Sequence, residues 1–150
     1  MQQSAGQIPN AKQASDATPH ILDSVPSTLP ALAQCQRISE LAAGVGFEWE
    51  SEADVWDQVA SERAEMEAEA VGTRERAEEF GDLLFSLVNV ARFEGIDAEK
   101  ALASSNAKFR RRWARVEELA RESGAAPEEC DADELNEFWR QTKREERGRL

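Results

Sequence analysis

The chain has 150 residues, which is enough for one domain with a single core of ordinary size. Hydrophobic residues make up 41% of it, and 30 acidic residues outnumber 18 basic ones. This balance predicts a soluble globular protein and argues against nucleic-acid binding, which favours a basic excess. No apolar run is long enough to span a membrane and no basic-then-apolar leader opens the chain, so we expect a cytoplasmic protein that keeps Cys35 and Cys130 reduced.

Acidic and basic residues are separated along the chain. Residues 48–82 contain 13 acidic and 3 basic residues, whereas residues 108–121 contain 6 basic and 2 acidic ones. Residues 140–150 are again basic, with 5 basic and 2 acidic residues. Such separation suits a site that holds cations beside an anionic substrate, although solvated helix faces in blocks would give the same pattern.

The first part of the chain predicts a tail followed by one domain. Residues 1–26 are rich in Gln, Ser, Ala and Pro without an apolar period, so we expect a flexible tail and a domain over residues 27–150. The first helix is expected to begin near Pro30, with Ser27 or Thr28 as its cap, and to end at Gly44. Residues 45–49 then form a loop with two aromatic side chains.

Four more helices follow from their capping residues. Ser51 is expected to cap a helix that runs to about Val71, and Thr73 one that runs to about Phe93. Asp97 is expected to begin a fourth helix that ends at Gly124, and Asp131 with Glu134 has the spacing of a capping box for the last helix. No segment alternates like a strand, so the sequence predicts an all-α, four-helix-bundle-like fold with an additional C-terminal helix.

The third helix carries acidic side chains in an unexpected place. Residues 80–93 are apolar nearly all the way round, which predicts a largely buried helix. Four polar side chains nonetheless share one face of it, at spacings of 3, 4 and 3 residues: Glu79, Asp82, Ser86 and Asn89. A buried carboxylate costs several kcal/mol unless it is paired or bound to a metal, and Arg74 and Arg76 are the only basic residues within nine positions of Asp82.

The second helix offers a matching acidic stripe, formed by Glu62, Glu65 and Glu69. A tight turn at residues 72–73 makes the two helices antiparallel neighbours, so Glu62 and Glu65 should face Glu79 and Asp82. Oxygen-only ligation favours Mg²⁺, with Mn²⁺ as a substitute, over zinc. The alternative is that these glutamates form surface ion pairs with arginines: Arg63, Arg74 or Arg76.

These residues resemble a known family. The segment Ser61-Glu62-Arg63-Ala64-Glu65, followed after residues 66–77 by Glu78-Glu79-Phe80-Gly81-Asp82, resembles the EExxE…EExxD signature of the all-α nucleoside triphosphate pyrophosphohydrolases. The sequences of residues 81–93, 106–112 and 45–49 resemble the MazG branch, and residues 24–32 resemble the entry to the C-terminal domain of long MazG proteins. The one departure is Ser61, which stands where the first glutamate of the signature is expected.

The resemblance implies hydrolysis of NTP or dNTP between the α- and β-phosphates, giving NMP and pyrophosphate with Mg²⁺ as cofactor. The implied metal ligands are four carboxylates: Glu62, Glu65, Glu79 and Asp82. Glu65, with Glu62 beside it, is expected to orient or deprotonate the attacking water. The expected nucleotide-binding residues are Lys108, Arg112, Trp139 and Lys143, to which we add Asn89 of the polar stripe.

Two of these expectations have an alternative. Trp139 would either stack on the nucleotide or pack in the core, and Arg111 and Arg115 are expected to face solvent. The resemblance and the apolar helices predict a homodimer or higher homo-oligomer, which could bring Lys143 of one copy to the carboxylates of another. A catalytically degenerate helical dimerisation module is the alternative to an enzyme.

Overall fold

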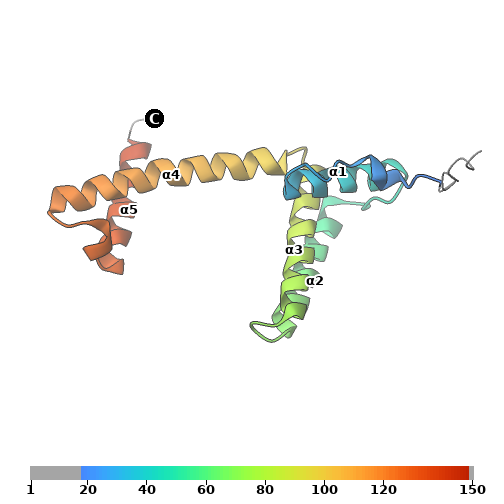
Figure 1. The fold of residues 1–150 in the computed structure, drawn as a ribbon, viewed down its shortest axis with the longest axis horizontal. Helices are drawn as coiled ribbons and strands as arrows, with labels where there is room; N and C mark the ends of the chain where they lie inside the picture. The colour runs from blue at the N-terminus through green and yellow to red at the C-terminus, as the bar shows by residue number, and fades with distance from the viewer. Residues whose placement is uncertain (1–17, 149–150) are drawn as a thin grey trace, which may run out of the picture.

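The computed structural model describes residues 18–148, which contain five α-helices, two short 3₁₀ helices and no strand (Figure 1). The α-helices are α1 (Ala31–Gly44), α2 (Glu52–Ala68), α3 (Arg74–Phe93), α4 (Ala98–Ser123) and α5 (Ala132–Arg147), and the 3₁₀ helices are η1 (Ile21–Ser24) and η2 (Pro127–Glu129). The prediction of an all-α fold is therefore confirmed. None of the helices over residues 18–148 combines the length and apolarity that crossing a bilayer requires.

Four of the five predicted helix caps are confirmed, and α1 begins near Pro30 as predicted. Ser51, Thr73 and Asp97 each accept a hydrogen bond from the backbone N–H three residues later, and Asp131 closes its capping box with Glu134. The cap of α1 was wrongly predicted, because Pro30 stands at that position and no side chain caps the helix. Most of the tail predicted for residues 1–26 lies outside the described residues, and η1 forms in its last part.

The helices form two packed groups that share α4. In the first group α2 and α3 make an antiparallel hairpin, and α1 lies across its end (Figure 1). Val55 of α2 and Val88 and Val90 of α3 are buried in this group. The side chain of Gln36 on α1 fixes the start of α4, because it donates to the Ile96 carbonyl and accepts from the Ala98 N–H.

The second group lies at the far end of α4. This helix leads away from α1, α2 and α3, and α5 packs along its distal half (Figure 1). Val116, Leu119 and Ala120 of α4 are buried there, whereas residues 101–111 are exposed throughout. The first half of α4 therefore has an uncovered surface that includes Leu102, which is 50% exposed.

The predicted burial of α3 was wrong for the single chain. Phe80 and Leu84 of this helix are 50% and 42% exposed, and Leu87 is 40% exposed. Its buried side chains lie in its second half: Ser86, Val88, Asn89 and Val90. The side chains of α3 are apolar nearly all the way round, as the sequence indicates. However, α1 and α2 cover only part of the circumference of this helix, because α4 points away from it.

The end of α4 depends on a glycine. Gly124 has a φ of 91°, in the left-handed region that residues with a Cβ enter at a cost. Gly44, at the end of α1, does not have a positive φ, and a Cβ added there would meet no other atom within 4 Å. We expect Gly124→Ala to lower the free energy of unfolding by about 1 kcal/mol. Gly44→Ala is the matched control, and urea unfolding of both variants measures the difference. An equal effect of the two substitutions would contradict this role of Gly124.

Candidate metal centre and adjoining cavity

Three carboxylates converge where α2 and α3 run side by side. Glu62 and Glu65 come from α2 and Glu79 from α3, and one oxygen of each lies within 4.8 Å of the others. Glu62 and Glu79 are half-buried, whereas Glu65 is exposed. The antiparallel hairpin therefore brings together two helix faces that the sequence had separated by more than a dozen residues.

The clustered carboxylates repel one another, and this repulsion contributes to a pKa shift at Glu79. The pKa of Glu79 is raised above its ordinary value, first by desolvation and then by repulsion from neighbouring carboxylates, Glu65 and Asp82 before Glu62 and Glu69. Repulsion of this kind favours a bound cation, because a cation offsets the charge of several carboxylates at once.

The arginines nearby do not neutralise the cluster. Arg63 pairs with Glu67 and Arg74 with Glu78, and Arg76 donates to the backbone carbonyl of Glu69. In the described part of the chain Glu62 and Glu65 receive hydrogen bonds from neutral side chains, those of Gln58 and Ser61. The predicted alternative of surface ion pairs at Glu62 and Glu65 is thus not what the structure contains.

Asp82 lies beside this cluster but not in its tight group. It was expected to be a buried carboxylate, and the structure instead leaves it exposed, because α2 covers only one side of this half of α3. Asp82 interacts electrostatically with Glu79, three residues earlier, and it lines a cavity together with Glu62. The predicted quartet is therefore present as three converging carboxylates with a fourth at their edge.

The cavity has a volume of about 290 Å³ and extends along α3. Asp82, Phe85, Ser86 and Asn89 line it from that helix. Asp82 and Asn89 are seven residues apart, which corresponds to roughly 10 Å of helix rise. The cavity thus leads from the acidic cluster to a second group of side chains, which α1 and the loop between α1 and α2 contribute: Ile38, Ser39, Ala42, Phe47 and Trp49.

Arg92 organises this second group. Its two terminal nitrogens donate to the two carboxylate oxygens of Glu48, each at 2.6 Å, and its Nε donates to the Ser39 hydroxyl at 2.6 Å. Ser39 in turn donates to the amide oxygen of Asn89. The guanidinium lowers the pKa of Glu48 below its ordinary value through this hydrogen bond.

Sequence reasoning missed Arg92, Glu48 and Ser39. A signal was available, because Arg92 is the one basic residue in the apolar segment 80–93 and requires a partner there. The partner could not be named, because Glu48 lies 44 residues away in a loop.

The predicted nucleotide-binding cations lie elsewhere. Lys108 is exposed on α4, and Lys143 is half-buried on α5. The guanidinium of Arg112 pairs with Glu146 at 2.8 Å and lies 5.9 Å from the ring centre of Trp139, whose ring in turn packs on Phe109 at 5.1 Å. Within one chain these residues belong to α4 and α5, and α5 with the distal half of α4 lies away from the α2–α3 hairpin (Figure 1).

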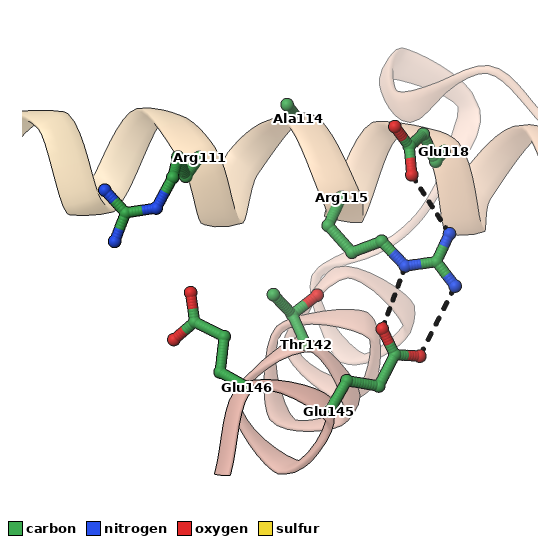
Figure 2. Close-up of a pocket in the computed structure, with 7 residues that line it drawn as sticks. All are labelled: Arg111, Ala114, Arg115, Glu118, Thr142, Glu145 and Glu146. Atoms are coloured by element: carbon green, nitrogen blue, oxygen red, sulfur yellow. Dashed lines mark hydrogen bonds and ion pairs between the residues drawn. The ribbon is translucent and has the colours of Figure 1, made fainter. Parts of the chain in front are cut away.

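A second cavity of about 640 Å³ lies between α4 and α5 (Figure 2). Arg115 was expected to face solvent, and that was wrong: it donates to Glu118, Glu122 and Glu145, the last of them from α5. Arg111 is exposed, as expected. This cavity is the larger one, but its central cation is already neutralised by carboxylates, so it does not favour a phosphate.

No family model matches the chain, but curated proteins do. The chain is 42% identical over 115 residues to the nucleoside triphosphate pyrophosphohydrolase/pyrophosphatase MazG of Thermotoga maritima, and the match covers 77% of this chain and 45% of that protein. It is 40% identical over 144 residues to the nucleoside triphosphate pyrophosphohydrolase of Escherichia coli K12, covering 93% of this chain and 55% of that protein. It is also 43% identical over 130 residues to the uncharacterized protein YabN of Bacillus subtilis, covering 85% of this chain and 27% of that protein.

The chain thus belongs to the MazG family, as its acidic motifs predicted. It spans about half the length of the first two of these relatives.

The Glu48–Arg92 pair gives a pH-dependent stability. Because the pKa of Glu48 is lowered in the folded chain, its contribution is complete above about pH 4.5 and is lost as the pH falls through the lowered pKa. We expect Glu48→Gln to reduce the free energy of unfolding by about 1 kcal/mol at pH 7 and by much less near pH 3. Urea unfolding at both pH values measures this, and a pH-independent difference between the two chains would contradict it.

Proposed function

We propose that the chain is a divalent-metal-dependent nucleoside triphosphate pyrophosphohydrolase that converts NTP or dNTP to NMP and pyrophosphate, with Mg²⁺ as the natural ion and Mn²⁺ as a substitute. The observation that carries the proposal is the convergence of Glu62, Glu65 and Glu79, which pair with no cation among residues 18–148, at the edge of a ligand-sized cavity. The activity named for relatives that are 40% and 42% identical supports it.

The donor set suits a hard cation. All the ligating atoms are carboxylate oxygens, which Mg²⁺ and Mn²⁺ prefer, and no histidine or cysteine joins the cluster among residues 18–148. We assign metal binding to Glu62, Glu65 and Glu79, with Asp82 one helical turn beyond Glu79. When bound, the cation supplies charge neutralisation at the phosphates and polarises the phosphorus that is attacked.

The chain's own groups then have separate roles. Glu65 is exposed and accepts a hydrogen bond from Ser61, so its carboxylate can reach solvent and orient or deprotonate the attacking water. Glu62 is half-buried and lines the cavity, so it can hold the phosphate end of a ligand through the cation.

We further infer that a second copy completes the site. The uncovered apolar side chains of α3 and α4 offer a surface for an isologous interface: Phe80, Leu84, Leu87 and Leu102 are at least 40% exposed. Residues 108–121 are basic and residues 48–82 acidic, so pairing would bring the arm of one copy toward the acidic cluster of the other. Lys108, Arg112 and Lys143 would then contact phosphates and Trp139 the nucleotide. We place this homo-oligomer in the cytoplasm, where the free thiols of Cys35 and Cys130 stay reduced.

The second candidate is a dimerisation module without catalysis. Two observations favour it: Ser61 replaces the first acidic residue of the signature, and apolar side chains on α3 and α4 are exposed. The assay below separates the two candidates, since a module would assemble without releasing pyrophosphate.

The test measures pyrophosphate release from a panel of NTPs and dNTPs, with Mg²⁺ and with EDTA. We expect Glu79→Gln and Asp82→Asn to reduce turnover by roughly 100-fold or more, because each removes a charged ligand while keeping its shape. Glu78→Gln is the matched control, because Glu78 is next in sequence to Glu79 and pairs with Arg74 instead. Turnover in EDTA, or unchanged turnover in both variants, would contradict the proposal.

The melting temperature gives a readout that does not depend on turnover. Mg²⁺ should raise it in the natural chain, because the ion binds only the folded cluster. Glu79→Gln should melt higher than the natural chain in EDTA, since one repelling charge is gone, and should gain less from Mg²⁺. An equal rise in melting temperature on adding Mg²⁺ to the natural chain and to Glu79→Gln would indicate that the ion binds outside this cluster.

Light scattering tests the assembly. We expect a mass of about twice the 16.7 kDa of one chain at micromolar concentration. Leu102→Glu should shift the mass toward one chain, because it places a charge in the uncovered apolar surface of α4. Ser104→Glu is the control, as it adds the same charge on the polar side of this helix. A mass of one chain together with full activity would contradict the inferred dimer.

A further inference from the structure

We propose that Gln36 is a positioning residue, which sets the direction in which α4 leaves the hairpin and so places the cations of the arm, formed by α4 and α5, for contact with the phosphates of the nucleotide. The proposal rests on the proposed function, because it takes the arm to bind phosphates. It is carried by one side-chain amide of α1, which hydrogen-bonds to the backbone on both sides of the joint between α3 and α4.

The joint between α3 and α4 is short and is capped by local bonds. The backbone N–H groups of Gly95 and Ile96 donate to carbonyls in the last turn of α3, at 3.0 and 2.7 Å. The side chain of Asp97 accepts from the backbone N–H three residues later, at 2.9 Å. These bonds shape the end of one helix and the start of the next, but they do not tie the joint to another part of the fold.

Gln36 is the link between this joint and α1. Its amide nitrogen donates to the Ile96 carbonyl at 3.1 Å, and its amide oxygen accepts from the Ala98 N–H at 2.9 Å. A carbonyl only accepts and a backbone N–H only donates, so these two partners fix the amide in one orientation. Within residues 18–148 no other side chain of α1 hydrogen-bonds to residues 94–98. Two bonds, one on each side of Asp97, hold the direction of this segment, whereas a single bond would let it swivel.

Packing contributes little to the direction of α4 near the hairpin. Ala98 and Glu99 are half-buried, but residues 100–111 are exposed. The buried side chains of α4 lie in its distal half, where α5 packs on the helix: Val116, Leu119 and Ala120. Figure 1 shows α4 leaving α1 and the hairpin, with α5 near its far end. The direction of the arm therefore depends on its first turn and on the joint before it.

A small rotation at the joint becomes a large displacement at the cations. At about 1.5 Å of rise per residue, Arg112 lies roughly 20 Å beyond Ala98 along the helix axis. A rotation of about 10° at Ala98 would move Arg112 by roughly 3–4 Å, which is more than a hydrogen bond to a phosphate oxygen tolerates. Lys143 would move with it, because α5 packs on α4. The carboxylates of the hairpin would keep their places, since they lie on the other side of the joint.

The first test compares Gln36→Met with the natural chain, because methionine has a similar length but forms neither hydrogen bond. We expect the KM for a triphosphate to rise about tenfold while kcat changes by less than about twofold, since contacts to phosphates are made before and during the reaction. The rise in melting temperature on adding Mg²⁺ should be the same in both chains. Gln34→Met is the matched control, because the Gln34 side chain donates to carbonyls of the segment before α1 instead.

The second test measures the direction of the arm without nucleotide. Nitroxide labels are attached to Ala68→Cys at the end of α2 and to Ser123→Cys at the end of α4, both at exposed positions. The two natural cysteines are replaced by alanine, and labelled copies are diluted with unlabelled ones so that distances within one chain are measured. Double electron–electron resonance should give a distance distribution that Gln36→Met widens or shifts by roughly 5 Å and that Gln34→Met leaves unchanged.

The two readouts separate this proposal from the proposed function. A changed distance distribution in Gln36→Met supports the role of Gln36 even where no triphosphate is hydrolysed. Where Gln36→Met does not fold, Gln36→Glu serves instead, because its carboxylate can accept from Ala98 but cannot donate to Ile96. A lower melting temperature with an unchanged KM and distance distribution would make Gln36 a stabilising residue only and would overturn the proposal. A changed distribution with an unchanged KM in an active enzyme would overturn it as well.

Discussion

The central constraint on this structure is the repulsion between carboxylates that the α2–α3 hairpin brings together. The antiparallel contact of α2 and α3 buries Val55, Val88 and Val90, and the same contact places Glu62, Glu65 and Glu79 within reach of one another. Apolar burial along the hairpin therefore offsets a repulsion that would otherwise push its helices apart. Such a cluster favours the binding of a cation, because the cation would offset a repulsion that is already present in the folded chain.

A second constraint gives the cavity its shape. The loop after α1 has few contacts of its own, and Phe47 in it is 85% exposed. The Glu48–Arg92 pair fastens this loop to α3, and the bond from Arg92 to Ser39 fastens α1 to the same point. One guanidinium therefore holds both the loop and α1 against α3.

A third feature of the fold is the exposed surface of α4. Residues 101–111 in the first half of α4 are exposed throughout, and the cations of the α4–α5 arm lie away from the carboxylates. Arg112 is meanwhile held by Glu146, and Arg115 by three glutamates. These ion pairs are partly exposed and worth little individually, and Arg115, which is held by three carboxylates, is the less available of the two for an anionic ligand.

The sequence by itself determined the helices, since their starts are set by local hydrogen bonds at Ser51, Thr73, Asp97 and Asp131. It also determined the acidic face shared by α2 and α3, because helical spacing and a tight turn fix which carboxylates can meet. Only the tertiary structure decided that Asp82 is exposed and that α4 leaves the hairpin, since periodicity shows which face is apolar but not what covers it. Only the tertiary structure joined Arg92 to Glu48, because a contact across 44 residues depends on the path of the whole chain.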